Sequence, residues 1–184
     1  MQRKNSPSLV LLVAFALIAL CVVARLLPHP PNFAPVAAVA LVGCLFLARH
    51  WQVGLVVVLG MGIGDALLGF YDLGVMVTVY ASLLLPLAAR RFITPSPTAL
   101  RIGAAAIGAG VGFFLTTNAA VWYFGSSYPP TADGLLASYA AGLPFLKWTL
   151  AGNLFWSAVL FGAFRLGARA SRGESLSTAR LLPA

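Results

Sequence analysis

The chain has 184 residues, of which 60% are hydrophobic and 9% are charged, with a net charge of +8 and a mean hydropathy of +0.93. A soluble domain carries about 25% charged residues, so this composition excludes an ordinary soluble protein and indicates a polytopic membrane protein. The positive charge does not indicate nucleic-acid binding, because the sequence offers no solvated domain that would carry a basic stripe.

Six apolar runs are long enough, or nearly so, to cross a bilayer, which takes roughly 20 apolar residues. They are residues 8–27, 34–49, 53–70, 73–89, 100–124 and 145–168. The second and fourth are short, and only brief polar breaks separate the runs. We therefore expect an all-α integral membrane protein with six transmembrane helices in one domain over residues 1–170. A disordered cytoplasmic tail over residues 171–184 would follow it.

The basic residues indicate the orientation of these helices. If both termini are cytoplasmic, ten of the twelve Lys and Arg residues lie on the cytoplasmic side, and only Arg25 and Lys147 lie outside. This bias follows the positive-inside rule. The first run also fits a cleaved signal peptide, but cleavage would remove the basic N-terminal anchor, so we expect an uncleaved helix. Cys21 and Cys44 lie within membrane runs and are expected to be small packing residues.

Asp65 is the carboxylate of the third run, in the string GMGIGDALLGF. It lies five residues before the end of that run, about 7–8 Å below the boundary. A carboxylate that faced lipid there would be unfavourable by a few kcal/mol, so Asp65 is expected to face the bundle. Arg25 is the first candidate partner and Lys147 the second. The pair would either pin two helices or contact a ligand, and the sequence leaves both roles open.

The fifth run contains the string FFLTTNAAVWYFG at residues 113–125. Asn118 and Trp122 are four residues apart and share a helical face. Asn118 would bond to another helix or to a ligand, and Trp122 would line a site or belong to an interfacial aromatic belt. A second stripe of small residues predicts a close helix–helix seam. Its members are Ala104, Gly108, Gly112 and Thr116.

The sixth run carries Thr149, Asn153 and Ser157 at intervals of four residues. Polar side chains on one face of a membrane helix point inward, so Asn153 is expected to form the floor of an outward-facing pocket or a tie between helices. Before this run, residues 134–143 predict a short helix on the outer surface, separated from the span by Pro144. This helix would act as a lid or lie inert at the interface.

The sequence lacks the motifs of several enzyme classes. No phosphate-binding loop and no HExxH motif occur, and the two histidines, His29 and His50, fall on opposite sides of the membrane. ATP hydrolysis, metal chemistry and Ser–His chemistry therefore have no residues to support them. We expect no enzymatic activity, no cofactor and no metal site. A membrane enzyme acting on lipid is the weakest hypothesis.

Four strings carry a resemblance to a known family: RLLPHPPNFAPVAAVAL (25–41), GDALLGF (64–70), TTNAAVW (116–122) and SYPPTADGLLASYAAGLPF (127–145). They resemble an uncharacterised group of small bacterial integral membrane proteins, classed as a domain of unknown function. The resemblance runs from about Leu9 to Arg165 and implies a multi-pass protein of the bacterial cytoplasmic (inner) membrane.

The predicted arrangement is also similar to the substrate-binding S components of energy-coupling-factor transporters. That similarity implies an S-component-like bundle that binds a vitamin or another micronutrient at its outer face. It also implies partners for uptake, namely a separate transmembrane coupling subunit and ATPases. The first run departs from the pattern, because Ala14, Ala16 and Ala19 do not give the Ala-x-x-x-Ala spacing of many such components.

The leading hypothesis is a membrane-embedded component that captures a small solute at the outer face. A structural or assembly protein without a ligand is the alternative. Aromatic residues would supply contact area and the charged pair would orient the solute. The predicted ligand-binding residues are Asp65, Asn118, Trp122, Tyr128, Tyr139 and Asn153, with Arg25 or Lys147 as the counter-charge.

Overall fold

The computed structural model describes residues 6–180, with the side chains of residues 171–180 left out. Over this range it contains helices and no strand. Five helical segments are long and apolar enough to cross a membrane. They are α1 (Pro7–Leu26), α3 (His50–Leu68), the run Leu73–Ile93, α6 (Ala99–Phe124) and the apolar part of α7 (Ala132–Arg180). The run Leu73–Ile93 consists of α4 (Leu73–Leu84), the 3₁₀ segment η2 (Leu85–Ala89) and α5 (Arg90–Ile93).

Local sequence signals determine where several helices begin and end. The side chains of Ser6, Asp72 and Thr98 cap the first turns of α1, α4 and α6 by accepting backbone N–H groups three residues on. Such caps satisfy donors that have no partner inside the helix. The helix α3 ends at Leu68 and is followed by the capping residue Gly69, whose φ of 109° is a conformation that glycine adopts without steric cost.

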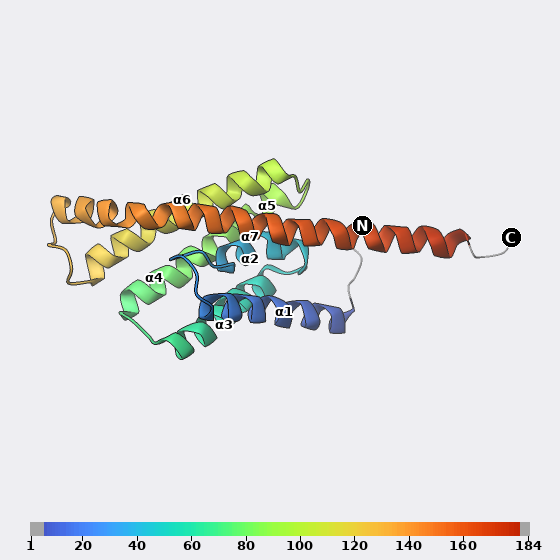
Figure 1. The fold of residues 1–184 in the computed structure, drawn as a ribbon, viewed down its shortest axis with the longest axis horizontal. Coiled ribbons are helices and arrows are strands. Elements are labelled where there is room, and N and C mark those ends of the chain that lie inside the picture. The colour runs from blue at the N-terminus through green and yellow to red at the C-terminus, as the bar shows by residue number, and fades with distance from the viewer. Residues whose placement is uncertain (1–5, 181–184) are drawn as a thin grey trace.

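The second predicted span is wrong as a full-length helix. Residues 34–49 form only α2 (Val36–Val42) and the 3₁₀ turn η1 (Gly43–Leu45), followed by irregular chain. All seven residues of α2 are buried, and the helix lies at the centre of the molecule (Figure 1). A helix that is apolar on every side is typical of both a membrane span and a buried core, so composition did not distinguish the two.

The segment that contains α2 nevertheless returns the chain to the side from which α1 started. Residues of α1 and α3 contact each other in the same order along the two helices: Cys21 lies beside Gly60, and Arg25, one turn later, lies beside Gly64. The two helices are therefore parallel. Residues 27–49 must lead back across the bundle before α3 begins, so the chain passes from end to end six times in the described range.

The predicted surface helix is also wrong as a separate element. Residues 134–143 are the first part of α7, which continues through Pro144 without a break and runs the length of the molecule (Figure 1). Packing against α6 explains this continuity. Ser138 Oγ donates to the Asn118 carbonyl (2.9 Å) and Tyr139 OH donates to the Leu115 carbonyl (3.0 Å). These contacts hold the segment in line, although proline removes one backbone donor.

The close seam of α6 lies on a different stripe from the predicted one. A Cβ at Gly108 or Gly112 would meet nothing within 4 Å, whereas at Gly110 it would lie 2.7 Å from Leu150 on α7. Ala106, one turn before Gly110, is buried. Small residues occur on several faces of α6, so the spacing of four identified stripes but not the one that faces a neighbour. Thr116 does contact another helix, at Ser82 on α4 (2.6 Å).

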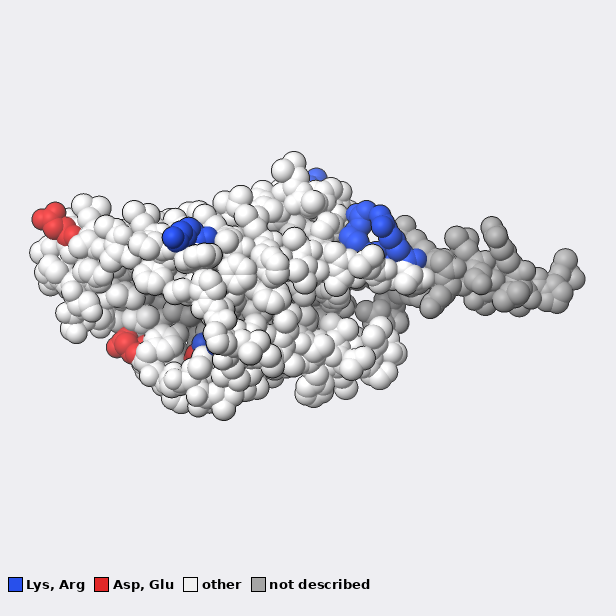
Figure 2. All heavy atoms as spheres, viewed as in Figure 1, with Lys and Arg blue, Asp and Glu red and all other residues white. Residues whose placement is uncertain are grey.

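The two ends of the bundle differ in charge. We call the end with the loops 27–35, 69–72 and 125–131 the polar end, and the opposite end, with the starts of α3 and α6, the basic end. Figure 2 shows acidic side chains at one end and the larger group of basic side chains toward the other. The predicted tail, residues 171–184, lies outside the described side chains, and only the backbone of 171–180 is described, as the last part of α7.

Candidate functional site

Asp65 and Arg25 form an ion pair between α3 and α1. Arg25 Nη2 donates to Asp65 Oδ1 (2.5 Å), and Arg25 Nη1 donates to the Met61 carbonyl (3.0 Å). Tyr80 OH of α4 donates to the second carboxylate oxygen, Oδ2 (2.8 Å). The Asp65 side chain is 1% exposed and that of Arg25 is 16% exposed. The predicted Arg25 partner is confirmed, and Asp65 faces the interior of the bundle.

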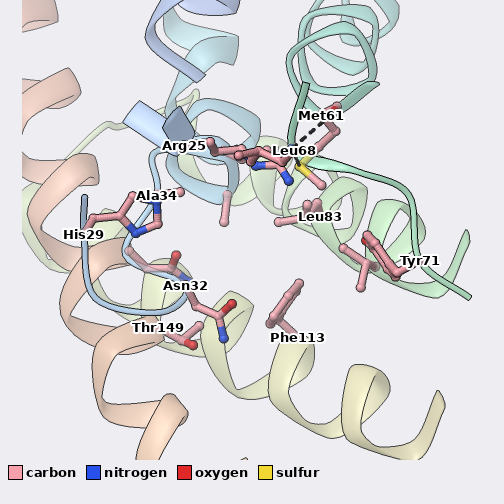
Figure 3. A pocket seen from close by; sticks show the side chains of 14 residues that line it. Arg25, His29, Asn32, Ala34, Met61, Leu68, Tyr71, Leu83, Phe113 and Thr149 are labelled. Atoms are coloured by element: carbon pink, nitrogen blue, oxygen red, sulfur yellow. Dashed lines mark hydrogen bonds between the residues drawn. The ribbon is translucent and has the colours of Figure 1, made fainter. Parts of the chain in front are cut away.

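A cavity of about 320 Å³ opens beside this pair, and we call it the main cavity. Figure 3 shows Arg25, Met61 and Leu68 on one side of it, and Phe113 and Thr149 on the opposite side. Asp65 does not line the cavity but lies behind Arg25. The volume is at the lower end of the range of roughly 300–1,000 Å³ that small-molecule sites occupy.

Besides Arg25, polar side chains of the main cavity come from the loop 27–35 and from α7. The loop supplies His29 and Asn32, and α7 supplies Thr149 and Asn153. Asn32 has a φ of 61°, a left-handed conformation that asparagine tolerates better than most residues. It lies in the tight turn that Phe33 N closes on the Pro30 carbonyl (3.0 Å).

Asn153 lies on the wall of the main cavity, as its position on the inward face of α7 predicted. It is 3% exposed, and its Nδ2 donates to the Ala106 carbonyl of α6 (3.2 Å). The same side chain therefore ties α7 to α6 and lines the cavity. The ligand and tie roles that the sequence left open are compatible with one position.

Tyr71 is a further hydroxyl on the wall of the main cavity, in the loop between α3 and α4. Burial, with the negative charge of Asp65 as the second cause, raises the pKa of its phenol. The phenol is therefore neutral at physiological pH and keeps its proton as a hydrogen-bond donor.

A smaller side cavity of about 190 Å³ contains the predicted residue Asn118. Asn118 Nδ2 donates to the Phe114 carbonyl of its own helix (2.8 Å). The two cavities share four wall residues, which lie between them: Asn32, Val79, Phe113 and Thr149. Asn118 and Asn153 thus belong to adjoining compartments rather than to one pocket.

Besides Asp65, four of the predicted site residues line neither cavity. Trp122 Nε1 donates to the Pro129 carbonyl (3.0 Å) in the following loop, where Tyr128 also lies. Tyr139 packs on Phe114 with ring centroids 5.7 Å apart. Lys147 is exposed on α7 with its Nζ 5.3 Å from the ring of Trp148, so it is not the counter-charge of Asp65.

Three aromatic residues are among those that sequence reasoning missed. Tyr80 bonds to Asp65, while Tyr71 and Phe113 form walls of the main cavity. Tyr80 lies seven residues inside an apolar helix, where a hydroxyl must find a partner, and this burial was the available signal. Its partner depends on how α3 and α4 cross, which the sequence pattern does not specify.

The model of one family, described as "Family of unknown function (DUF6580)", matches residues 4–175. No curated protein and no solved structure matches the chain. The match spans the elements that form the ion pair and both cavities.

Proposed function

Since the chain belongs to the Family of unknown function (DUF6580), we propose from the geometry of its site that it captures a small solute in the main cavity. The observation that carries this proposal is an interior cavity whose walls combine Arg25, Asn153 and Thr149 with apolar side chains. Sites for small molecules have this composition: mostly apolar walls with a few convergent polar groups.

The charges around the main cavity support a solute that is uncharged overall and has polar groups on an apolar body. Asp65 balances the charge of Arg25, so a charged solute in the main cavity would find no unpaired charge of opposite sign on Arg25. The polar groups on the cavity wall include the guanidinium, the Tyr71 and Thr149 hydroxyls and the Asn32 and Asn153 amides. A vitamin-like micronutrient without a net charge would have this character, and a polar group left without a partner on binding would cost affinity.

We place the protein in the bacterial cytoplasmic membrane with its termini inside, so that the main cavity opens toward the outer face. Six passages of the described chain between the two ends, five of them along long apolar helices, and the grouping of basic residues at one end support this orientation. Uptake would then use a separate transmembrane coupling subunit and ATPases, as in a transporter with an S-component-like binding subunit. The chain itself would bind and release the solute.

The test is the thermal stability of the full chain, purified in detergent, against a panel of vitamins and related metabolites. A ligand at a hundred times its dissociation constant should add about 2.7 kcal/mol to the free energy of unfolding. Val79 lies on the wall shared by the two cavities, so Val79→Phe should fill that space and remove the shift. Val77→Phe is the matched control, because Val77 is 59% exposed on the same helix.

A ligand-free structural role is the second candidate, and one observation favours it. The polar side chains Asp65, Asn118 and Asn153 already hold hydrogen-bond partners within the protein. If no compound stabilises a folded protein across a broad panel, these contacts are simply ties between and within helices, and the capture proposal is wrong. A shift that survives in Val79→Phe would place the solute elsewhere.

A further inference from the structure

A second hollow lies at the basic end, far from the main cavity. It is open, has a volume of about 680 Å³ and is lined by Ala48, Arg49, His50, Trp51, Arg90, Arg91 and Thr94. We call it the basic hollow. Its residues come from the first turn of α3 with the chain before it, and from α5 with the residue that follows. The proposed solute site uses none of them.

Three guanidinium groups surround the basic hollow, and none of the carboxylates with described side chains lies beside them. The acidic residues among those with described side chains are Asp65, Asp72 and Asp133, and all three lie at the polar end. One guanidinium is fixed in place, because Arg90 Nη2 donates to the Ala48 carbonyl across the hollow (2.6 Å). Arg49 and Arg91 are exposed and keep their donors available for a phosphate, which guanidinium groups bind in a bidentate manner.

The surroundings of the basic hollow match a lipid better than a free anion. Trp51, on its rim, is 59% exposed, and exposed tryptophans at the ends of membrane helices lie at the level of the lipid headgroups. Beyond Trp51 the same face of α3 presents exposed apolar side chains at helical spacing: Leu55, Val58 and Leu59. Acyl chains would lie along this track while the phosphate reaches the arginines.

We propose that the basic hollow binds the phosphate headgroup of an anionic phospholipid from the leaflet at the basic end. Arg49, Arg90 and Arg91 hold the phosphate, and the outer face of α3 holds the acyl chains. Basic pockets on the cytoplasmic side of membrane helices bind such headgroups. The lipid stabilises the corner between α3 and α5, where the contact from Arg90 to Ala48 joins two parts of the chain.

Native mass spectrometry of the full chain in detergent tests the proposal. The chain is mixed in turn with phosphatidylglycerol, cardiolipin, phosphatidylcholine and inorganic phosphate. We expect the two anionic lipids to stay bound, and phosphatidylcholine and inorganic phosphate to bind at least tenfold more weakly. Equal binding of inorganic phosphate would identify a free-anion site and overturn the lipid proposal, as would equal binding of phosphatidylcholine.

Paired double variants separate the basic hollow from general positive charge. Arg49→Gln with Arg91→Gln should weaken anionic lipid binding about fivefold for each arginine removed. Arg165→Gln with Arg169→Gln removes the same charge from exposed positions on α7 outside the hollow and should leave binding unchanged. Equal losses in both pairs, or no loss in the first, would overturn the proposal. If the first pair does not fold, Arg91→Gln alone makes the same comparison with Arg169→Gln.

Discussion

The ion pair of Arg25 and Asp65 concentrates the main electrostatic cost of the fold at a single place. A carboxylate that is 1% exposed is stable only when its charge is compensated and its oxygens are bonded. Arg25 supplies the charge and one bond, and Tyr80 supplies the bond to the second oxygen. The arrangement leaves Arg25, and not Asp65, facing the main cavity.

Asp65→Asn should destabilise the protein by about 3 kcal/mol or more, because it leaves the partly buried charge of Arg25 without its counter-charge. Arg25→Gln combined with Asp65→Asn removes both charges and should cost less than Asp65→Asn alone. Thermal unfolding in detergent measures the double-mutant cycle. A single variant as stable as the wild type would show that the pair does not stabilise the fold.

Tyr80→Phe tests the remaining bond to the carboxylate with almost no change in shape. A hydrogen bond to a charged group contributes about 1.5–3 kcal/mol, and one between neutral groups about 0.5–1.5 kcal/mol. Tyr139→Phe is the comparison, because its hydroxyl bonds to the neutral Leu115 carbonyl. Unfolding measurements should therefore show a larger loss for Tyr80→Phe, and equal losses would contradict the assignment.

At the scale of helices, close approach between α1 and α3 positions the ion pair. A Cβ at Gly60 would lie 2.7 Å from the Cβ of Cys21, so the two backbones are in contact one turn before Arg25 and Asp65. Helices in membranes associate through such small residues because lipid gives no hydrophobic drive between them. The same geometry holds Arg25 above Gly64, where a side chain would displace the guanidinium.

Gly60→Ala should separate α1 from α3 and lower stability by about 1–3 kcal/mol, the usual cost of overpacking. Gly108→Ala on α6 is the control, because nothing lies within 4 Å of that position. It should be neutral or stabilising by up to about 1 kcal/mol, since alanine favours the helix. Thermal unfolding of both variants checks the contrast, and a similar loss at Gly108 would mean that α6 has a partner on that face.

At the scale of the whole molecule, charge separation between the two ends predicts the direction of insertion. Ser127 lies in the loop at the polar end and Ser96 in the loop before α6 at the basic end, and both are exposed. In intact bacterial cells a membrane-impermeant maleimide should label Ser127→Cys, whereas Ser96→Cys should react only after permeabilisation. The native Cys21 and Cys44 are buried and should give little background. The opposite pattern would reverse the proposed orientation.

The sequence by itself determined the class of the protein and the ends of most helices. The class follows from apolar runs of nearly bilayer length, and helix starts follow from capping residues such as Asp72 and Thr98. Both features depend on residues that are neighbours along the chain. The partner of Asp65 was also predictable, because few cations lie at the right depth of an apolar chain. Asn153 was placed on an inward face by helical spacing alone.

Only the tertiary structure decided which apolar segments meet and where space remains between them. The short α2, the continuous α7 and the Gly110 seam each depend on neighbouring helices, whose positions hydropathy does not encode. A cavity is space that packing leaves unfilled, so Tyr71 and Phe113 become wall residues only when distant helices are placed together. Local periodicity identifies the stripes along each helix, while the stripe that contacts a neighbour depends on shape complementarity across the whole bundle.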